Sequence, residues 1–269
     1  IEARSRHALM PLRILRNRDR SGAYLIMLCV GTAMFGMFFF LTVFVQNVWG
    51  YSALKTGVAY LPMIAVVMAM AGLGAQLVPR IGARPLLIAG SAIGAGGLFW
   101  LSRISEHSSY AGGLLGPTLV AGAGLGMLFM PLTLVSLSRV PERDAGLASS
   151  LLNTGQQVGG ALGLAVLGTV AWTAVADSVR SQIAAAAARA GHPPAGGAGQ
   201  IPHAIYVHAL ATGFSRGFLV SAGIALLGLA VALVAIRVRR ADLTGAQVPG
   251  ASLPAAGDAV PAGTSQPAA

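Results

Sequence analysis

The feature that most limits how this chain can fold is a set of six long, mainly apolar stretches without Asp, Glu, Lys or Arg. They cover residues 21–54, 56–79, 85–102, 107–138, 145–176 and 217–236. A helix that crosses a bilayer needs about 20 mainly apolar residues, whereas a membrane-spanning strand shows about ten residues of alternating character. Because these stretches are continuous rather than alternating, the sequence predicts an all-α membrane protein with six transmembrane helices.

The same stretches divide the chain into regions. Trimmed to their apolar parts, they predict spans over residues 23–46, 57–78, 85–102, 111–137, 146–175 and 217–237. Residues 1–22 are predicted to be a basic lead-in at the cytoplasmic interface, 23–237 the transmembrane domain, and 177–214 an external loop. Residues 238–269, rich in Ala, Pro and Gly, are predicted to be a disordered cytoplasmic tail. Residue 1 is Ile rather than Met, so we expect a longer reading frame upstream.

The basic residues predict the orientation, because cytoplasmic loops collect Lys and Arg. Of the 18 Lys and Arg residues, thirteen fall on the side of the two termini and five on the other side. We therefore expect a multi-pass protein of the cell membrane, with both termini of this segment cytoplasmic. The net charge of +10 is divided into short groups between apolar runs and forms no continuous patch, which argues against a nucleic-acid partner.

Polar side chains within the spans are few and concentrate in the fifth. The span interiors lack Asp, Glu, Lys, Arg and His, so any proton-coupling group is expected outside this chain. Asn153, Gln156 and Gln157 share one helical stripe with Gly160. Amides facing lipid would cost free energy, so they should bond neighbouring helices or line a water-filled cavity. The sequence leaves both interpretations open.

Other residues within the spans are candidates for packing or for the cavity lining. Gly155, Gly159 and Gly163 recur at four-residue steps, a spacing that lets helix backbones approach closely. Aromatic and thioether side chains suit an adaptable apolar cavity. The candidates for such a lining, with packing or lipid contact as the alternative, are Phe35, Phe38, Phe39, Met127 and Met130.

The histidines give little support for metal or catalytic chemistry. His192, His203 and His208 have irregular spacing and no neighbouring Cys or carboxylate in the sequence, so a solvated loop is expected rather than a metal site. No span carries the interior histidine that an intramembrane Ser/His protease would need. We therefore expect neither a cofactor nor an enzyme.

Three sequence stretches resemble a known family. The turn "LVPRIGARPLLIAG" (77–90) matches, at Arg80, Gly82 and Arg84, the Gly-x-Leu-Ala-Asp-Arg-x-Gly-Arg-Lys turn of the major facilitator superfamily. Pro79 stands where that motif has Asp, and Ala75 where it has its first Gly, as in a degenerate second-half copy. Residues 38–62 and 139–170 resemble the fourteen-helix drug:proton antiporter family of this superfamily.

The resemblance implies the C-terminal six-helix half of a transporter. In such a fold, spans 23–46 and 111–137 would line a central cavity, with 57–78 and 146–175 beside them. The implied function is proton-coupled efflux of drugs or amphiphilic small molecules by alternating access. The implied partners are a small-molecule substrate, the lipid bilayer and a missing N-terminal half with the coupling carboxylates. Alternatives are a facilitator for another small solute or, less favoured, the permease subunit of an ATP-driven transporter.

Overall fold

The computed structural model describes residues 17–138, 140–190 and 202–237, and these contain helices and turns only. The elements are α1 (Arg18–Asn47), α2 (Ala53–Ile81), α3 (Ala83–Leu101), η3 (Tyr110–Leu115), α4 (Gly116–Leu137), α5 (Glu142–Ala190) and α6 (His203–Ala235). Within this part of the chain, six helices are long and apolar enough to cross a membrane. The predicted all-α class with six spanning helices is confirmed.

Local sequence signals explain where several helices begin and end. Asn17 precedes α1, and its side-chain oxygen accepts hydrogen bonds from the backbone N–H groups of Asp19 and Arg20. Gly82 separates α2 from α3 with a φ of +87°, a left-handed conformation that favours glycine. The predicted span 111–137 consists of the π-helical turn η3 followed by α4, which starts beside Pro117, a residue without a backbone N–H.

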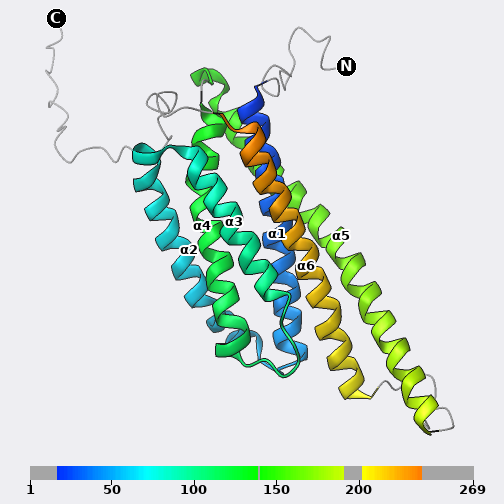
Figure 1. Cartoon of the computed structure of the whole chain (residues 1–269). Coiled ribbons are helices and arrows are strands. Elements are labelled where there is room, and N and C mark those ends of the chain that lie inside the picture. The colour runs from blue at the N-terminus through cyan, green and yellow to red at the C-terminus, as the bar shows by residue number, and fades with distance from the viewer. Residues whose placement is uncertain (1–16, 139, 191–201, 238–269) are drawn as a thin grey trace, which may run out of the picture.

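The segment predicted to be an external loop, 177–214, is largely helical where the structure describes it. α5 continues to Ala190, and α6 already begins at His203. Both helices extend past α2, α3 and α4 at the lower end in Figure 1. Hydropathy marks only the part of a helix that lipid covers, whereas the alanine run 184–188 favours helix in water as well. The tail 238–269, residues 1–16 of the lead-in, and His192 lie outside the described residues.

The six helices form two layers. One layer has the order α2, α4, α1, α5, with α2 at the left and α5 at the right of Figure 1. The second layer is the pair α3 and α6, which pack on each other and on α4, α1 and α5. The opposite face of the four-helix layer has no second layer in the described chain, and we call it the uncovered face. α2 is the least buried of the six helices.

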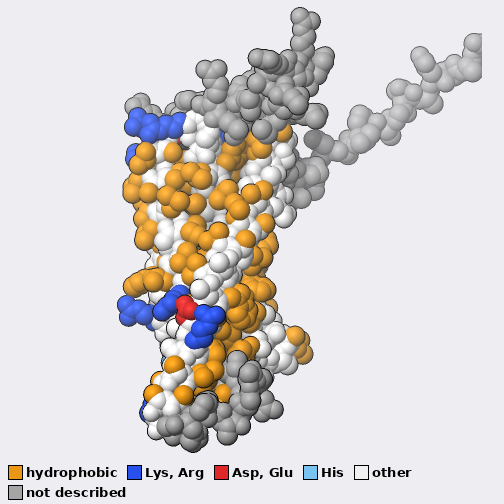
Figure 2. Space-filling view, turned by 90° about the vertical axis from the view of Figure 1, so that its right-hand side faces the viewer, with side chains coloured by type: hydrophobic (Ala, Val, Ile, Leu, Met, Phe, Trp, Pro, Cys, Tyr) orange, Lys and Arg blue, Asp and Glu red, His pale blue; other side chains and the backbone are white. Residues whose placement is uncertain are grey.

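The outer surface has the character of a membrane protein. Figure 2 shows Lys and Arg side chains at two levels, near the top and lower down, with a band rich in hydrophobic side chains between them. Large apolar side chains are exposed on the membrane-spanning helices, among them Met68 at 71% and Leu226 at 53%. Because water would penalise so much exposed apolar surface, the band is the part of the molecule that lipid covers.

Candidate functional site: the uncovered face

Three phenylalanines of α1 lie toward the uncovered face. Phe35 and Phe39 are exposed to 38% and 46%, while the neighbouring Phe40 is fully buried. Phe38 is half-buried and meets the Tyr60 ring of α2 edge-on, with 5.4 Å between ring centroids. Phe35 lies over α5, because a β-carbon placed on Gly160 would come within 2.7 Å of its ring. The three rings therefore span the surface between α2 and α5.

Tyr60 and Thr42 add a polar group to this surface that the sequence reasoning missed. The two hydroxyl oxygens lie 2.9 Å apart and share a hydrogen bond between α1 and α2. Tyr60 is only half-buried. The available signal was one of several polar residues within each of two apolar runs, and the sequence does not reveal that these two residues meet.

The amides of α5 lie on the same side as Phe35. Asn153 and Gln157 are exposed, and they share a stripe with Gly160, which contacts the Phe35 ring. Gln156 is half-buried, and its backbone carbonyl lies against Gly31 of α1. Among the described residues, no hydrogen bond is recorded for the side chains of these three residues. Asn153 and Gln157 therefore present free donors and acceptors to whatever fills this face.

The α5 glycines face α1 instead. A β-carbon on Gly159 would lie 2.2 Å from the Leu28 carbonyl oxygen, and one on Gly163 would lie 2.7 Å from the Thr32 backbone. Gly155 is less tight, at 3.4 Å from the Tyr24 carbonyl oxygen. We call this contact the glycine seam.

The methionines do not join the phenylalanines. Met127 is 9% exposed and belongs to a small cluster with Val78 and Leu86, against which Met130 also packs. These residues lie between α2, α3 and α4, so the structure does not bring the five candidates of the predicted lining together. Spacing along one helix identifies a shared stripe but not the neighbour that the stripe faces.

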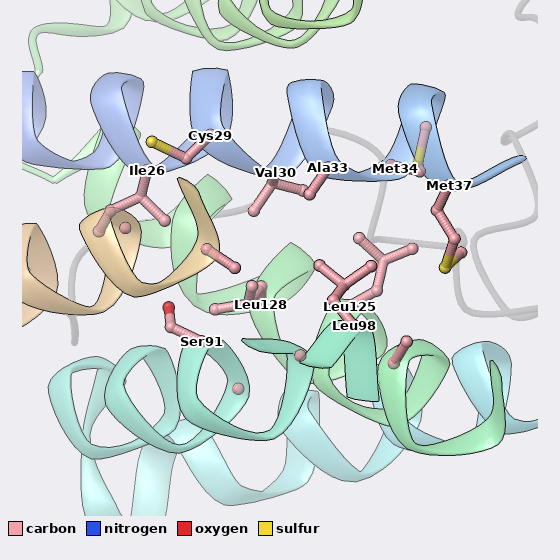
Figure 3. Close-up of a pocket in the computed structure, with 15 residues that line it drawn as sticks. Ile26, Cys29, Val30, Ala33, Met34, Met37, Ser91, Leu98, Leu125 and Leu128 are labelled. Atoms are coloured by element: carbon pink, nitrogen blue, oxygen red, sulfur yellow. The ribbon is translucent and has the colours of Figure 1, made fainter. Parts of the chain in front are cut away.

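A separate apolar cavity lies between the two layers. It holds about 50 Å³ and is lined by α1, α3, α4 and α6. Figure 3 shows Ile26 and Val30 of α1 facing Leu125 and Leu128 of α4 across it. Small-molecule sites usually measure about 300–1,000 Å³, so this cavity alone cannot hold a drug-sized ligand.

The turn between α2 and α3 holds the three residues of the sequence motif. Arg80 and Arg84 are exposed, on either side of Gly82. Arg84 Nη2 donates a hydrogen bond to the Leu233 carbonyl oxygen, at 3.0 Å, near the C-terminal end of α6. Its positive charge lies where the α6 dipole is negative, which stabilises the contact. The turn thus ties α3 to α6.

His208 has a carboxylate partner that its sequence neighbours do not reveal. Its Nδ1 atom lies 2.7 Å from Oε1 of Glu106, a residue of the loop after α3. The hydrogen bond with His208 lowers the pKa of the Glu106 carboxyl below its ordinary value. His208 is exposed but lies in α6 rather than in a loop, and its carboxylate partner is 102 positions away in the sequence. The described residues contain no group of three or more potential metal ligands.

Comparisons with known proteins identify the family of the chain. The family model described as Major Facilitator Superfamily matches residues 2–164. The cephamycin export protein of Amycolatopsis lactamdurans is 40% identical over 183 residues, which cover 66% of this chain and 37% of that protein. The puromycin resistance protein of Streptomyces alboniger is 31% identical over 248 residues, covering 91% of this chain and 46% of that protein.

A third relative is also matched over less than half of its length. The tetracenomycin C resistance and export protein of Streptomyces glaucescens is 30% identical over 253 residues, which cover 86% of this chain and 47% of that protein. The matched region therefore spans less than half the length of each of these three relatives.

Proposed function

Since the chain belongs to the major facilitator superfamily and is a multi-pass membrane protein, we propose that it forms the C-terminal half of an exporter of drugs or amphiphilic small molecules. The observation that carries the proposal is the uncovered face, where aromatic rings and unbonded amides lie together on membrane-spanning helices. The similar proteins that are named for export or resistance support the direction of transport.

The chemistry of the uncovered face favours amphiphilic substrates. Phe35, Phe38 and Phe39 offer apolar surface and aromatic faces, which also attract cations. Asn153 and Gln157 offer hydrogen bonds without a fixed charge. Exposed amides would be costly against lipid, so this face borders either water or protein. We infer that it lines the substrate path. Another small solute is the alternative substrate class, and an enzyme is not proposed.

A second six-helix unit would complete the cavity. The three relatives are more than twice as long as the region they share with this chain, which supports a partner half. In the described helices, the acidic residues lie toward the helix ends, and the central parts are free of them. We infer that the coupling carboxylates for proton antiport belong to the other half. The two halves would then rock around the shared cavity in alternating access.

The proposed location is the cell membrane, with both termini of this segment cytoplasmic. The basis is the excess of Lys and Arg in the connections at that end. Arg80 and Arg84 would then lie on the cytoplasmic side, where Arg84 already binds the end of α6. A reporter fused after residue 240 should read cytoplasmic, and an external reading would overturn the orientation.

The test of function is dye efflux from cells that carry the complete transporter. Efflux of Hoechst 33342 should depend on the proton gradient and stop when an uncoupler removes it. Asn153→Ala together with Gln157→Ala should reduce efflux, because these amides face the path. Thr154→Ala, one residue past Asn153 and about 100° round the helix, is the matched control and should leave efflux unchanged. Equal efflux by both variants would contradict the proposed path.

A further inference from the structure

A second recess lies away from the residues proposed to bind substrate. It is a groove of about 460 Å³ between α1 and α6, at the end of the bundle where α1 begins and α6 ends. Its lining residues are Arg18, Ser21, Gly22, Leu25, Ala230, Val231, Val234 and Ala235. Most of this lining is apolar, and Leu25 and Val234 are exposed to 43% and 62%.

Two arginines bind the end of α6: Arg18, which lines this groove, and Arg84, which bonds the carbonyl group next to the one that Arg18 bonds. Arg18 Nη2 donates to the Val234 carbonyl oxygen at 2.8 Å, and Arg84 Nη2 donates to the adjacent Leu233 carbonyl oxygen at 3.0 Å. Both arginines are exposed. A guanidinium carries five N–H donors in a fixed fork, so one hydrogen bond to a carbonyl leaves further donors for an anion.

The other charged side chains near this groove leave its net charge positive. Asp19 is the acidic residue, and its carboxylate accepts a hydrogen bond from the backbone N–H of Arg237. Arg20 is 6% exposed and donates to the Ser138 carbonyl oxygen at the end of α4. The guanidinium groups of Arg18 and Arg84 are thus exposed, and within the part of the chain that the structure describes, the neighbouring Asp19 carboxylate is already hydrogen-bonded.

The groove extends from this positively charged site along an apolar channel. From Arg18 to Leu25 the groove follows eight residues of α1, which is about 10 Å of helix. It starts at the basic end of the bundle and runs toward the hydrophobic band. A free anion would bind the arginines but would not contact the apolar lining of the groove. A neutral lipid would pack against that lining but would not pair with the positive charge. Both features fit one molecule with an anionic head and an acyl chain.

We propose that the groove between α1 and α6 binds one anionic phospholipid, with its phosphate at Arg18 and Arg84 and an acyl chain along Leu25 and Val231. This site differs from the proposed substrate path and does not depend on the identity of the substrate. The bound lipid would hold the end of α6 against α1 and α3, because its phosphate bridges arginines from both helices.

The test measures lipid binding to the full-length protein in a neutral detergent by native mass spectrometry. Phosphatidylglycerol is compared with phosphatidylcholine of the same chains. Arg18→Gln and Arg84→Gln should each lower the affinity for phosphatidylglycerol by about fivefold, the factor expected for one basic residue near an anionic bilayer surface. Arg80→Gln is the matched control, because Arg80 is an exposed arginine of the same turn. It should bind phosphatidylglycerol like the wild type.

Two further measurements separate the lipid from other occupants. Ala230 is an exposed residue of the groove lining, so Ala230→Trp should fill the groove and weaken phosphatidylglycerol binding while all arginines remain. Unchanged binding in this variant, or in both arginine variants, would overturn the proposal, since the lipid would then bind elsewhere or the chain's own residues would occupy the groove. Displacement of phosphatidylglycerol by an equal concentration of inorganic phosphate would also overturn it, because the site would then recognise a free anion.

Discussion

The two sides of α5 differ sharply in how closely they are packed. On the side of the glycine seam, Gly159 and Gly163 approach the α1 backbone so closely that a β-carbon would overlap it. On the side of the uncovered face, Asn153 and Gln157 are exposed and make no recorded hydrogen bond in the described structure. The two sides are separated by less than one turn of the same helix.

This difference separates stability from function within one element. Close backbone contact needs residues without side chains, and any added atom there must displace a neighbouring helix. An exposed side chain on the other face can change without disturbing a neighbour. We therefore expect substitutions in the seam to act on folding and substitutions on the uncovered face to act on substrate handling.

The largest effect is expected from Gly159→Leu. A β-carbon at this position would lie 2.2 Å from the Leu28 carbonyl oxygen. The variant should lose more than about 3 kcal/mol of the free energy of unfolding, or fail to accumulate as folded protein. Gly168→Leu is the control, because no atom lies within 4 Å of its β-carbon position. The measurement is thermal unfolding in detergent, and equal melting temperatures for the two variants would show that the seam is not closely packed.

A smaller loss is expected from Thr32→Val, which keeps the shape of the seam. Thr32 Oγ1 donates a hydrogen bond to the Gly159 carbonyl oxygen at 2.8 Å. Removing it should lower the free energy of unfolding by about 0.6–1.7 kcal/mol, the range for interhelical hydrogen bonds in membranes. Thr169→Val is the control, because its hydroxyl bonds the Ala165 carbonyl oxygen within α5 and makes no contact across the seam. An equal loss in both variants would argue against a special contribution of the seam.

The hydrogen bond between Glu106 and His208 joins α6 to the loop after α3, and its contribution to stability can be measured. Because the folded pKa of Glu106 is lowered below 4.5, its contribution to stability is present above that pH and is lost as pH falls through the folded pKa. The melting temperature of Glu106→Gln should lie below that of the wild type near neutral pH and converge with it on acidification. Asp177→Asn, which removes an exposed pair with Arg180, is the control. A difference that grows toward low pH would contradict this assignment.

The smallest effect on stability is expected from Gln157→Ala. Its side chain is exposed, so the free energy of unfolding should change by less than about 0.5 kcal/mol. If the uncovered face lines the substrate path, the same variant should alter the relative export of different dyes. A uniform loss of export that follows a lower melting temperature would instead identify Gln157 as a packing residue.

The sequence predicts the six helices well because each one must satisfy the same local requirement, a long apolar run without charge. It predicts less about which residues meet, because each contact joins helices that are distant in the chain. Met127 and Phe38 illustrate this limit: both looked suited to an adaptable lining, yet Met127 packs with Val78 and Leu86 while Phe38 meets Tyr60.

The length of α5 shows a second limit. Hydropathy predicted a span that ends at residue 175, whereas the helix continues to Ala190. Once a helix has left the lipid, its end depends on helix propensity rather than on apolar length, and the alanine run continues it. The sequence also did not reveal the partner of His208, because Glu106 precedes it by 102 residues and sequence neighbours show no such distant contact.

Cysteine accessibility tests most directly whether the uncovered face lines the substrate path. Cys29 is the single cysteine and is buried, so Cys29→Ser provides a suitable background for Asn153→Cys and for Leu162→Cys. Residue 162 is also exposed but lies about 180° round α5 from residue 153. A hydrophilic maleimide should label position 153 in the complete transporter, a transported dye should protect it, and position 162 should stay unlabelled in the membrane. Labelling of 162 but not 153, or labelling of 153 that no dye affects, would contradict the account.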